Sequence, residues 1–180
     1  MTGGAGSAAK VLHVVVRDEA PEDIGAIDEV TRAAFRDHPY SRQTEHLIVH
    51  DLREAGALSV SLVATLQGRV VGHAAFSPVT IAVQDLAWCG LGPVSVTPAH
   101  QRSGIGTALI RRGLRRLREH GVAGCVVLGD PGYYARFGFA PHAGLVCPGV
   151  PAEHFMTLAF DGVVPTGEVR YQPAFSRSRP

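Results

Sequence analysis

Two glycines stand one residue apart, directly before a stretch with helical periodicity. The stretch is HQRSGIGTALIRRGLRRL, residues 100–117, with glycines at 104 and 106 and no acidic residue in the first turn of the expected helix. A glycine-rich approach to a helix leaves backbone N–H groups uncovered, and these groups add to the positive end of the helix dipole. The segment therefore predicts a binding site for an anion.

The spacing of residues distinguishes three kinds of phosphate-binding glycine loop. A P-loop needs Lys and then Ser or Thr after its last glycine, but here Thr107 follows Gly106 directly. The dinucleotide-binding fingerprint needs a third glycine three residues later, where this chain has Leu109. The third pattern is Gln/Arg-x-x-Gly-x-Gly/Ala after a strand that ends in Val-x-Pro. The segment VTPAHQRSGIG, residues 96–106, matches it in full.

This loop resembles motif A of the GCN5-related N-acetyltransferases, in which loop amides hold the pyrophosphate of acetyl-coenzyme A. The segment YYARFGF, residues 133–139, follows the next expected strand and resembles motif B of the same family. The two segments together look closest to the YhbS-type subgroup. The resemblance covers residues 14–175 and is strongest over residues 91–139.

The resemblance implies a single-domain mixed α/β fold: a central, mostly antiparallel sheet with a splayed parallel pair and flanking helices. It implies an enzyme that moves an acetyl group directly from acetyl-coenzyme A to a primary amine, without a metal ion. The parallel strands that splay apart are expected at 93–96 and 125–128. The residues expected to bind the cofactor are Val94, Ser95, Val96, Gln101, Arg102, Ser103, Gly104, Ile105, Gly106 and Thr107.

Tyr134 is the residue that the resemblance assigns as general acid. A phenol with a pKa of about 10 stays protonated at neutral pH, and a thiolate whose thiol has a pKa of about 8.5 needs a proton as it leaves. Its neighbour Tyr133 is interpreted as a packed aromatic side chain. No acid lies on the expected strand at 92–96, so His73, Glu45 and Asp85 are weak candidates for a general base.

Two other functions compete with this interpretation. One is a non-catalytic acyl-coenzyme A-binding module with a sensing or regulatory role, which would not need an acid at Tyr134. The other is a structural partner protein, which would not need an intact phosphate loop. The acceptor has no recognisable motif, so a polyamine-like amine, an amino acid, an aminated drug and a protein amine remain open. Acceptor specificity is expected from the first two helices, their loop at 36–42 and the C-terminal segment.

Hydrophobic periodicity predicts the elements that hold these residues. Strands are expected at 11–16, 58–81 (a hairpin that turns at Gln67 and Gly68), 92–98, 124–130, 156–160 and 168–171, and helices at 20–35, 43–54, 105–117 and 131–137. The strand–helix–strand step over 92–130 predicts a parallel pair. The domain is expected to span 11–175, between a disordered leader at 1–10 and a flexible tail at 176–180.

Composition excludes several classes of protein. The chain has 180 residues, 46% of them hydrophobic, and a net charge of +1, so it is neither a disordered chain nor one that binds nucleic acid by bulk charge. Three cysteines without a CxxC motif predict free thiols in a reducing compartment. No apolar run is long enough to span a membrane, and no signal peptide is evident. These features predict a cytoplasmic enzyme without a membrane partner, and they are compatible with a homodimer.

Three further patterns have ordinary interpretations. His46 and His50 share a helix face but lack a third ligand, so a solvated pair is expected in place of a metal site. The five arginines within 111–118 predict a solvent-facing side of a helix. Asp130 precedes a short helix and is expected to cap it.

Overall fold

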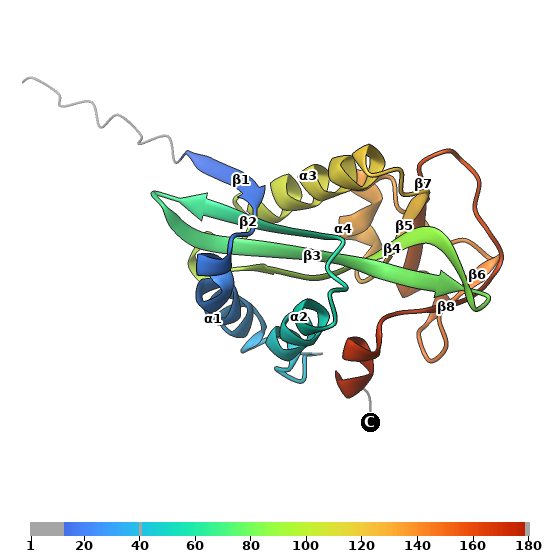
Figure 1. Ribbon diagram of the computed structural model, residues 1–180, viewed down its shortest axis with the longest axis horizontal. Helices are drawn as coiled ribbons and strands as arrows, with labels where there is room; N and C mark the ends of the chain where they lie inside the picture. Colours follow the sequence, from blue (N-terminus) through green and yellow to red (C-terminus); the bar gives the residue numbers. More distant parts are fainter. Residues whose placement is uncertain (1–12, 40, 179–180) are drawn as a thin grey trace, which may run out of the picture.

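A long, twisted sheet runs through the molecule and carries helices on both faces (Figure 1). The computed structural model describes residues 13–39 and 41–178. Its strands are β1 (Val14–Asp18), β2 (Val60–Leu66), β3 (Arg69–Ile81), β4 (Gln84–Val96), β5 (Gly124–Leu128), β6 (Leu145–Val146), β7 (Phe155–Ala159) and β8 (Gly167–Arg170). Its helices are α1 (Ile24–Phe35), α2 (Glu45–Glu54), α3 (Ile105–Glu119) and α4 (Pro131–Tyr134). Short 3₁₀ turns are η1 (Pro21–Asp23), η2 (Pro98–His100), η3 (Ala135–Phe137), η4 (Ala152–His154) and η5 (Pro173–Ser178).

The strand order is β1-β2-β3-β4-β5-β7, with β8 beside the far end of β3 and β6 beside β8. The pairs along this path are antiparallel except β4 with β5, which are parallel and joined through α3. The predicted strand–helix–strand unit and the mostly antiparallel sheet are therefore confirmed.

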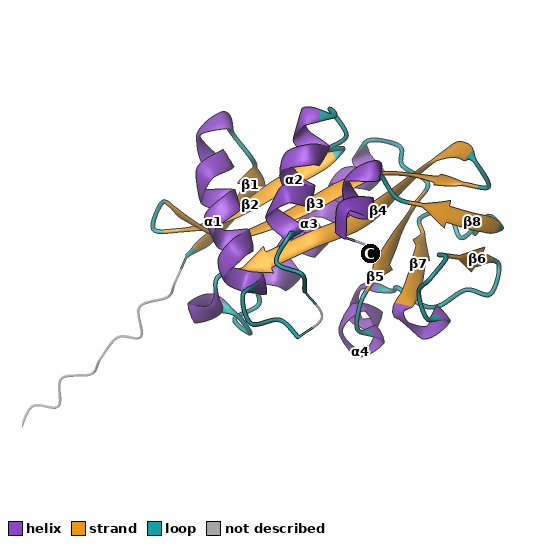
Figure 2. Ribbon diagram, turned by 90° about the horizontal axis from the view of Figure 1, so that it is seen from below, coloured by secondary structure: helices purple, strands orange, loops and turns teal. Residues whose placement is uncertain are grey.

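The helices form two layers around the sheet: α1 and α2 cover one face and α3 covers the other (Figures 1 and 2). The apolar face of α3 packs on the sheet, because Leu109, Ile110, Leu114 and Leu117 are at most 4% exposed and belong to the main core. At the start of α1, Ile24 is 39% exposed, whereas Ile27 and Val30 on the same helix are buried. The residue buried at that end is Asp23, whose carboxylate accepts hydrogen bonds from the Arg17 guanidinium at 2.6 and 2.9 Å.

Two tight turns set the lengths of the central strands. The turn between β2 and β3 lies at Gln67 and Gly68, as predicted, and both residues have positive φ (51° and 78°). The turn between β3 and β4 lies at Ala82 and Val83, also with positive φ (48° and 65°), and carries no glycine. The sequence did not predict it, so β4 begins well before the expected strand at 92–98.

The C-terminal segment folds back onto the sheet as β8 and η5. Because η5 extends to Ser178, residues 176–178 are part of a helical turn, whereas the sequence had assigned them to the tail. The predicted leader lies outside the described residues. Cys89, Cys125 and Cys147 are buried free thiols. In the described part of the chain, no helix is long and apolar enough to cross a membrane.

Candidate active site

A cleft opens where β4 and β5 separate. The two strands pair only from Trp88–Gly124 to Leu91–Val127, but β4 continues along β3 as far as Val96. Gly92 and Pro93 are inserted opposite Ala75, a bulge that bends β4 away from its parallel neighbour. The predicted splayed pair is thus present, and β4 beyond Leu91 presents an edge without a strand partner on its β5 side within the described chain. The cavity at this point has a volume of about 830 Å³.

The glycine loop closes one end of the cleft. Gly104 is the N-cap of α3 with φ +87° and ψ 0°, a left-handed conformation that favours glycine. The first hydrogen bond of the helix runs from the Ala108 N–H to the Gly104 carbonyl at 2.9 Å, so the three N–H groups before it have no helical partner. No side chain caps them and no acid lies in the first turn. The predicted anion site is therefore supported by the local geometry.

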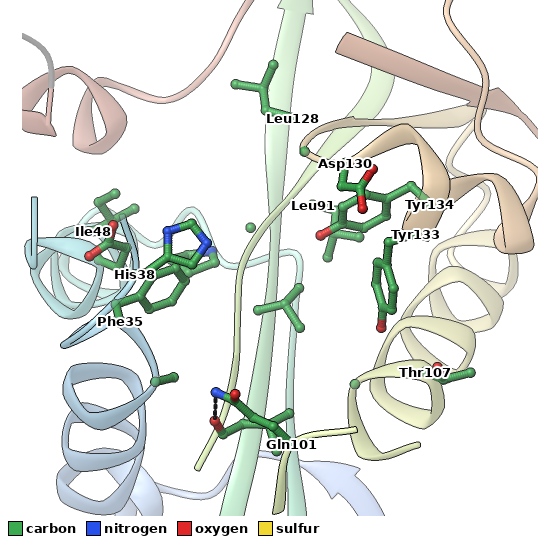
Figure 3. A pocket seen from close by; sticks show the side chains of 18 of the residues that line it. Phe35, His38, Ile48, Leu91, Gln101, Thr107, Leu128, Asp130, Tyr133 and Tyr134 are labelled. Atoms are coloured by element: carbon green, nitrogen blue, oxygen red, sulfur yellow. Dashed lines mark hydrogen bonds between the residues drawn. The ribbon is translucent and has the colours of Figure 1, made fainter. Parts of the chain in front are cut away.

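One hydrogen bond ties this loop to the strand beside it. The Gln101 side-chain amide donates to the Val96 carbonyl at 3.1 Å, which is the dashed line in Figure 3. Arg102 follows with φ +60° and an exposed guanidinium. This hydrogen bond holds the loop before α3 against the end of β4, where both line the cavity.

Most of the predicted cofactor residues line the cavity: Val94, Val96, Gln101, Arg102, Gly104, Gly106 and Thr107. Three others turn their side chains elsewhere. Ser95 is 2% exposed, and its hydroxyl lies 3.2 Å from that of Thr31 in α1. The Ser103 hydroxyl donates to the His100 carbonyl at 2.5 Å, and the Ile105 side chain is in the core.

Tyr134 lies across the cleft from Phe35, the last residue of α1, and from His38 just after it (Figure 3). Asp130 precedes it and caps α4 as predicted, accepting the Gly132 N–H at 2.9 Å. The Tyr134 ring fits against the backbone of Gly129, where a Cβ would lie 2.5 Å from ring atom Cε2. Burial, followed by the neighbouring Tyr133 and Cys125, raises the pKa of Tyr134 well above its usual value. The phenol therefore remains protonated, as a proton donor must.

Tyr133 is a packed aromatic residue, as predicted, with its ring against those of Tyr134 and Phe137, and it also reaches the cavity. Its hydroxyl lies 3.1 Å from the position of a Cβ on Gly106, and it points toward the start of α3 (Figure 3). The Arg136 guanidinium lies 4.5 Å from the centre of the Tyr133 ring. Tyr133 and Arg136 both line the cavity, which sequence reasoning missed.

Of the three base candidates, only Glu45 lines the cavity. His73 is completely buried, with Nε2 2.8 Å from the Ser61 hydroxyl, and burial lowers its pKa despite the nearby Glu19. Asp85 accepts the Ala87 N–H at the start of β4, in the hairpin with β3. Glu45 lies in the first turn of α2, where the Ser41 hydroxyl donates to its Oε2 at 2.8 Å.

Opposite Tyr134, side chains from three segments form a second side of the cavity. We call this surface the aromatic wall; it comprises Phe35, His38, Glu45, Ile48, Tyr171 and Phe175. Phe35, His38 and Ile48 face Tyr134 across β4 in Figure 3. The sequence indicated the α1–α2 region and the C-terminal segment as contributors, but not which side chains.

The remaining patterns are clear in the structure. His46 is 8% exposed, so the predicted solvated pair with His50 was wrong at that residue. Arg111, Arg115 and Arg118 are exposed on α3, in agreement with the predicted solvent-facing side. Across the described ranges, no three His, Cys, Asp or Glu side chains are grouped as metal ligands.

Comparisons with known proteins agree with this arrangement. A model of the acetyltransferase (GNAT) family matches residues 27–139. The uncharacterized N-acetyltransferase YhbS of Escherichia coli K12 is 39% identical over 173 residues, which cover 91% of this chain and 99% of YhbS.

Two crystal structures have the same fold. A GNAT family acetyltransferase from Brucella melitensis in complex with acetyl-CoA is 51% identical, with a TM-score of 0.82, and the match covers 91% of this chain and 98% of that one. Escherichia coli YhbS in complex with CoA is 37% identical, with a TM-score of 0.83, and the match covers 98% and 96% of the two chains.

Proposed function

Because this chain belongs to the acetyltransferase (GNAT) family, we propose that its β4–β5 cleft binds acetyl-coenzyme A and that Tyr134 protonates the leaving thiolate. The protein is an N-acetyltransferase. Bound acetyl-coenzyme A supplies an acetyl group activated as a thioester: its C–S bond breaks as the amide C–N bond forms, the thiolate takes up a proton and the amine gives one up.

The glycine loop supports binding of the pyrophosphate. The free N–H groups at the start of α3 point a partial positive charge at the cavity, and Arg102 adds a full one. A Cβ at Gly104 would meet no atom within 4 Å, so the space beside its backbone is open to a ligand. The Tyr133 hydroxyl beside Gly106 would add a neutral hydrogen-bond donor at the same end.

The open edge of β4 suits the pantetheine arm. The amide groups of pantetheine would pair with the backbone of residues 92–96 as an added strand would, because β5 does not pair with this part of β4. An N–H within 94–96 would polarise the acetyl carbonyl in the manner of an oxyanion hole. Tyr134 lies on the other side of the cleft with a protonated hydroxyl.

Direct transfer to the amine, without an acetylated enzyme, is supported by the positions of the cysteines. A covalent intermediate on sulfur needs an accessible thiolate. All three cysteines are buried, and burial raises the pKa of Cys89 and of Cys125. Buried free thiols also support the reducing environment of the cytoplasm as the location of the enzyme.

One observation carries the proposal: the uncapped start of α3 and the Tyr134 side chain line the same cavity. The test is thermal unfolding with acetyl-coenzyme A. At one hundred times its dissociation constant, a ligand that binds only the folded state stabilises it by about 2.7 kcal/mol. We expect a clear rise in Tm with acetyl-coenzyme A and much smaller effects with NAD or ATP. No shift at millimolar acetyl-coenzyme A would contradict the proposed function.

A further inference from the structure

The C-terminal part of the aromatic wall packs against β4. Tyr171 and Phe175 come from the C-terminal segment, and their rings lie 5.1 Å apart. Each packs over a glycine of β4: Tyr171 over Gly90, where a Cβ would be 2.4 Å from Cε1, and Phe175 over Gly92, where the separation is 3.9 Å. The Gln172 side-chain amide donates to the Pro78 carbonyl on β3 at 2.9 Å. This hydrogen bond ties the segment that carries Tyr171 and Phe175 to the sheet.

From the other side, α1 and α2 complete an apolar surface. Ile48 is 6% exposed and Phe35 is partly buried, with its ring 5.7 Å from that of His38. Flat rings that come from two distant segments and face one cavity favour a flat apolar group as ligand.

A single carboxylate, Glu45, interrupts this apolar surface. The hydroxyl of Ser41, which itself accepts the Gln43 N–H at 2.8 Å, orients it. Within residues 13–39 and 41–178, no Arg, Lys or His lies within ion-pair distance of the Glu45 carboxylate. The arginines of the cavity, Arg102 and Arg136, belong to the glycine loop and the segment after α4, on the other side. A second carboxylate of the cavity, Asp130, lies beside Tyr134 on that other side and caps α4. The two arginines and the start of α3 thus belong to one side of the cavity, and Glu45 is the carboxylate of the aromatic wall.

Resting on the proposed function, we propose that the acceptor is a primary amine joined by a short chain to an aromatic body, without a carboxylate of its own. Glu45 would hold the ammonium group before it loses a proton, and the rings of Phe35 and Phe175 would hold the body. The same rings can also face the cation at close range. In the net reaction, an ammonium ion and a thioester give an N-acetyl amide, a thiol and one proton released to water.

This arrangement disfavours the other amines that the enzyme could meet. An amino acid would place its carboxylate near Glu45, and like charges at close range repel. A polyamine with one ammonium group at Glu45 would bring a second ammonium group among the apolar side chains of the aromatic wall, which has no other carboxylate. A lysine in a peptide would leave the rings facing a flexible aliphatic chain.

The experiment is a comparison of acceptors with the intact protein. The panel is 2-phenylethylamine, spermidine, L-phenylalanine and a lysine-containing peptide, with released thiol and the mass of the acetylated product as readouts. We expect kcat/KM for 2-phenylethylamine to exceed that of each other acceptor by about tenfold or more. Any other acceptor in the lead, or no product from 2-phenylethylamine, overturns the proposal.

Variants then test the roles of single residues. Glu45→Gln and Phe175→Leu should each raise KM for 2-phenylethylamine by about tenfold and leave the affinity for acetyl-coenzyme A unchanged. Glu54→Gln is the matched control, because Glu54 is exposed at the end of the same helix. An unchanged KM in both cavity variants contradicts the assignment. The Tm shift with acetyl-coenzyme A, measured on the same samples, separates this failure from failure of the proposed function.

Discussion

The ring of Tyr171 occupies the space that a side chain at position 90 would need. A Cβ on Gly90 would lie 2.4 Å from Tyr171 Cε1 and 2.9 Å from Cδ1, so the strand and the C-terminal segment fit only because residue 90 is glycine. The aromatic wall thus depends on a residue that does not itself line the cavity.

Gly90→Ala should displace Tyr171 and with it the aromatic wall. We expect a loss of about 1–3 kcal/mol in the free energy of unfolding, the usual cost of overpacking. KM for the acceptor should rise while the affinity for acetyl-coenzyme A is kept. Urea denaturation and steady-state kinetics measure the two effects. Gly25→Ala in α1 is the control, because its Cβ meets nothing within 4 Å and alanine favours a helix. Equal behaviour of the two variants would contradict the packing argument.

Gly104→Val should abolish binding of acetyl-coenzyme A. The backbone there has φ +87°, which a β-branched residue rarely adopts, so the loop must change shape to accept it. Titration calorimetry on the folded variant should show at least a tenfold weaker affinity. Gly56→Val imposes a similar strain at φ +63°, also with open space around the Cβ, just after α2 and outside the cavity. It should lower stability and leave the affinity unchanged. Near-normal binding by Gly104→Val would mean that the loop only begins a helix.

Tyr134→Phe should lower kcat by roughly 10²–10⁴-fold, the usual span for a positioned general acid. KM should change little, because the hydroxyl acts as charge develops on sulfur. Tyr133→Phe is the comparison, since its hydroxyl lies beside Gly106; that variant should weaken acetyl-coenzyme A binding more than it lowers kcat. Stopped-flow or steady-state measurement of released thiol gives kcat and KM for both variants. Full activity of Tyr134→Phe would reassign the proton to water.

Stability should fall in acid because of Glu19. Burial alone would raise the pKa of this carboxyl, but the His73 ring, with Nε2 3.7 Å away, and hydrogen bonds from Arg53 and Ser61 lower it to about 2. The folded state thus favours the carboxylate; its contribution is complete above the unfolded pKa of about 4.5 and is lost as the pH falls toward 2. We expect Glu19 to account for roughly 2–3 kcal/mol over that window. Glu19→Gln should flatten the pH dependence of the unfolding midpoint between pH 5 and 2. If the unfolding midpoint of Glu19→Gln depended on pH as steeply as that of the unaltered protein, the role of Glu19 would be contradicted.

His73 acts in the same direction at higher pH. Because burial lowers its pKa in the folded state, the unfolded state binds the extra proton more readily as the pH falls below about 6.5. The two groups together predict a stability that declines in acid in two stages, which titration of Tm against pH can separate.

The cofactor side of the site was predictable because its signals are local. The glycine loop and Tyr134 lie within 34 residues of one another in the chain, and each belongs to a short segment whose spacing is informative. A role for the Ser95 side chain could have been excluded by the alternation of a strand, because Val94 and Val96 share one face and the side chain between them must face the other. Tyr133 packs against the rings of Tyr134 and Phe137 as predicted, but nothing in the sequence shows that its hydroxyl lies beside Gly106.

The aromatic wall was not predictable to the residue. Phe35 and Phe175 are 140 positions apart and line the same cavity only because β8 returns to pair with β3 and Phe175 then lies over Gly92 of β4. Glu45 is one of sixteen acidic residues, and its place in the first turn of α2 carries no functional signal by itself. The turn at Ala82 and Val83 was missed for a similar reason: tertiary pairing of β3 with β4 imposes positive φ on residues that do not favour it.

The two ends of the cleft are encoded in different parts of the chain. One continuous stretch, residues 91–136, supplies the glycine loop, the two arginines and Tyr134, whereas the aromatic wall comes from residues 35–48 and 171–175. From the proposed acceptor site, we expect substitutions in those two short segments to alter acceptor preference and to leave the binding of acetyl-coenzyme A unchanged. The fold is accordingly a scaffold for directed evolution: a library randomised only at the aromatic wall, selected against a panel of amines, would explore new acceptors while every member keeps its acetyl donor.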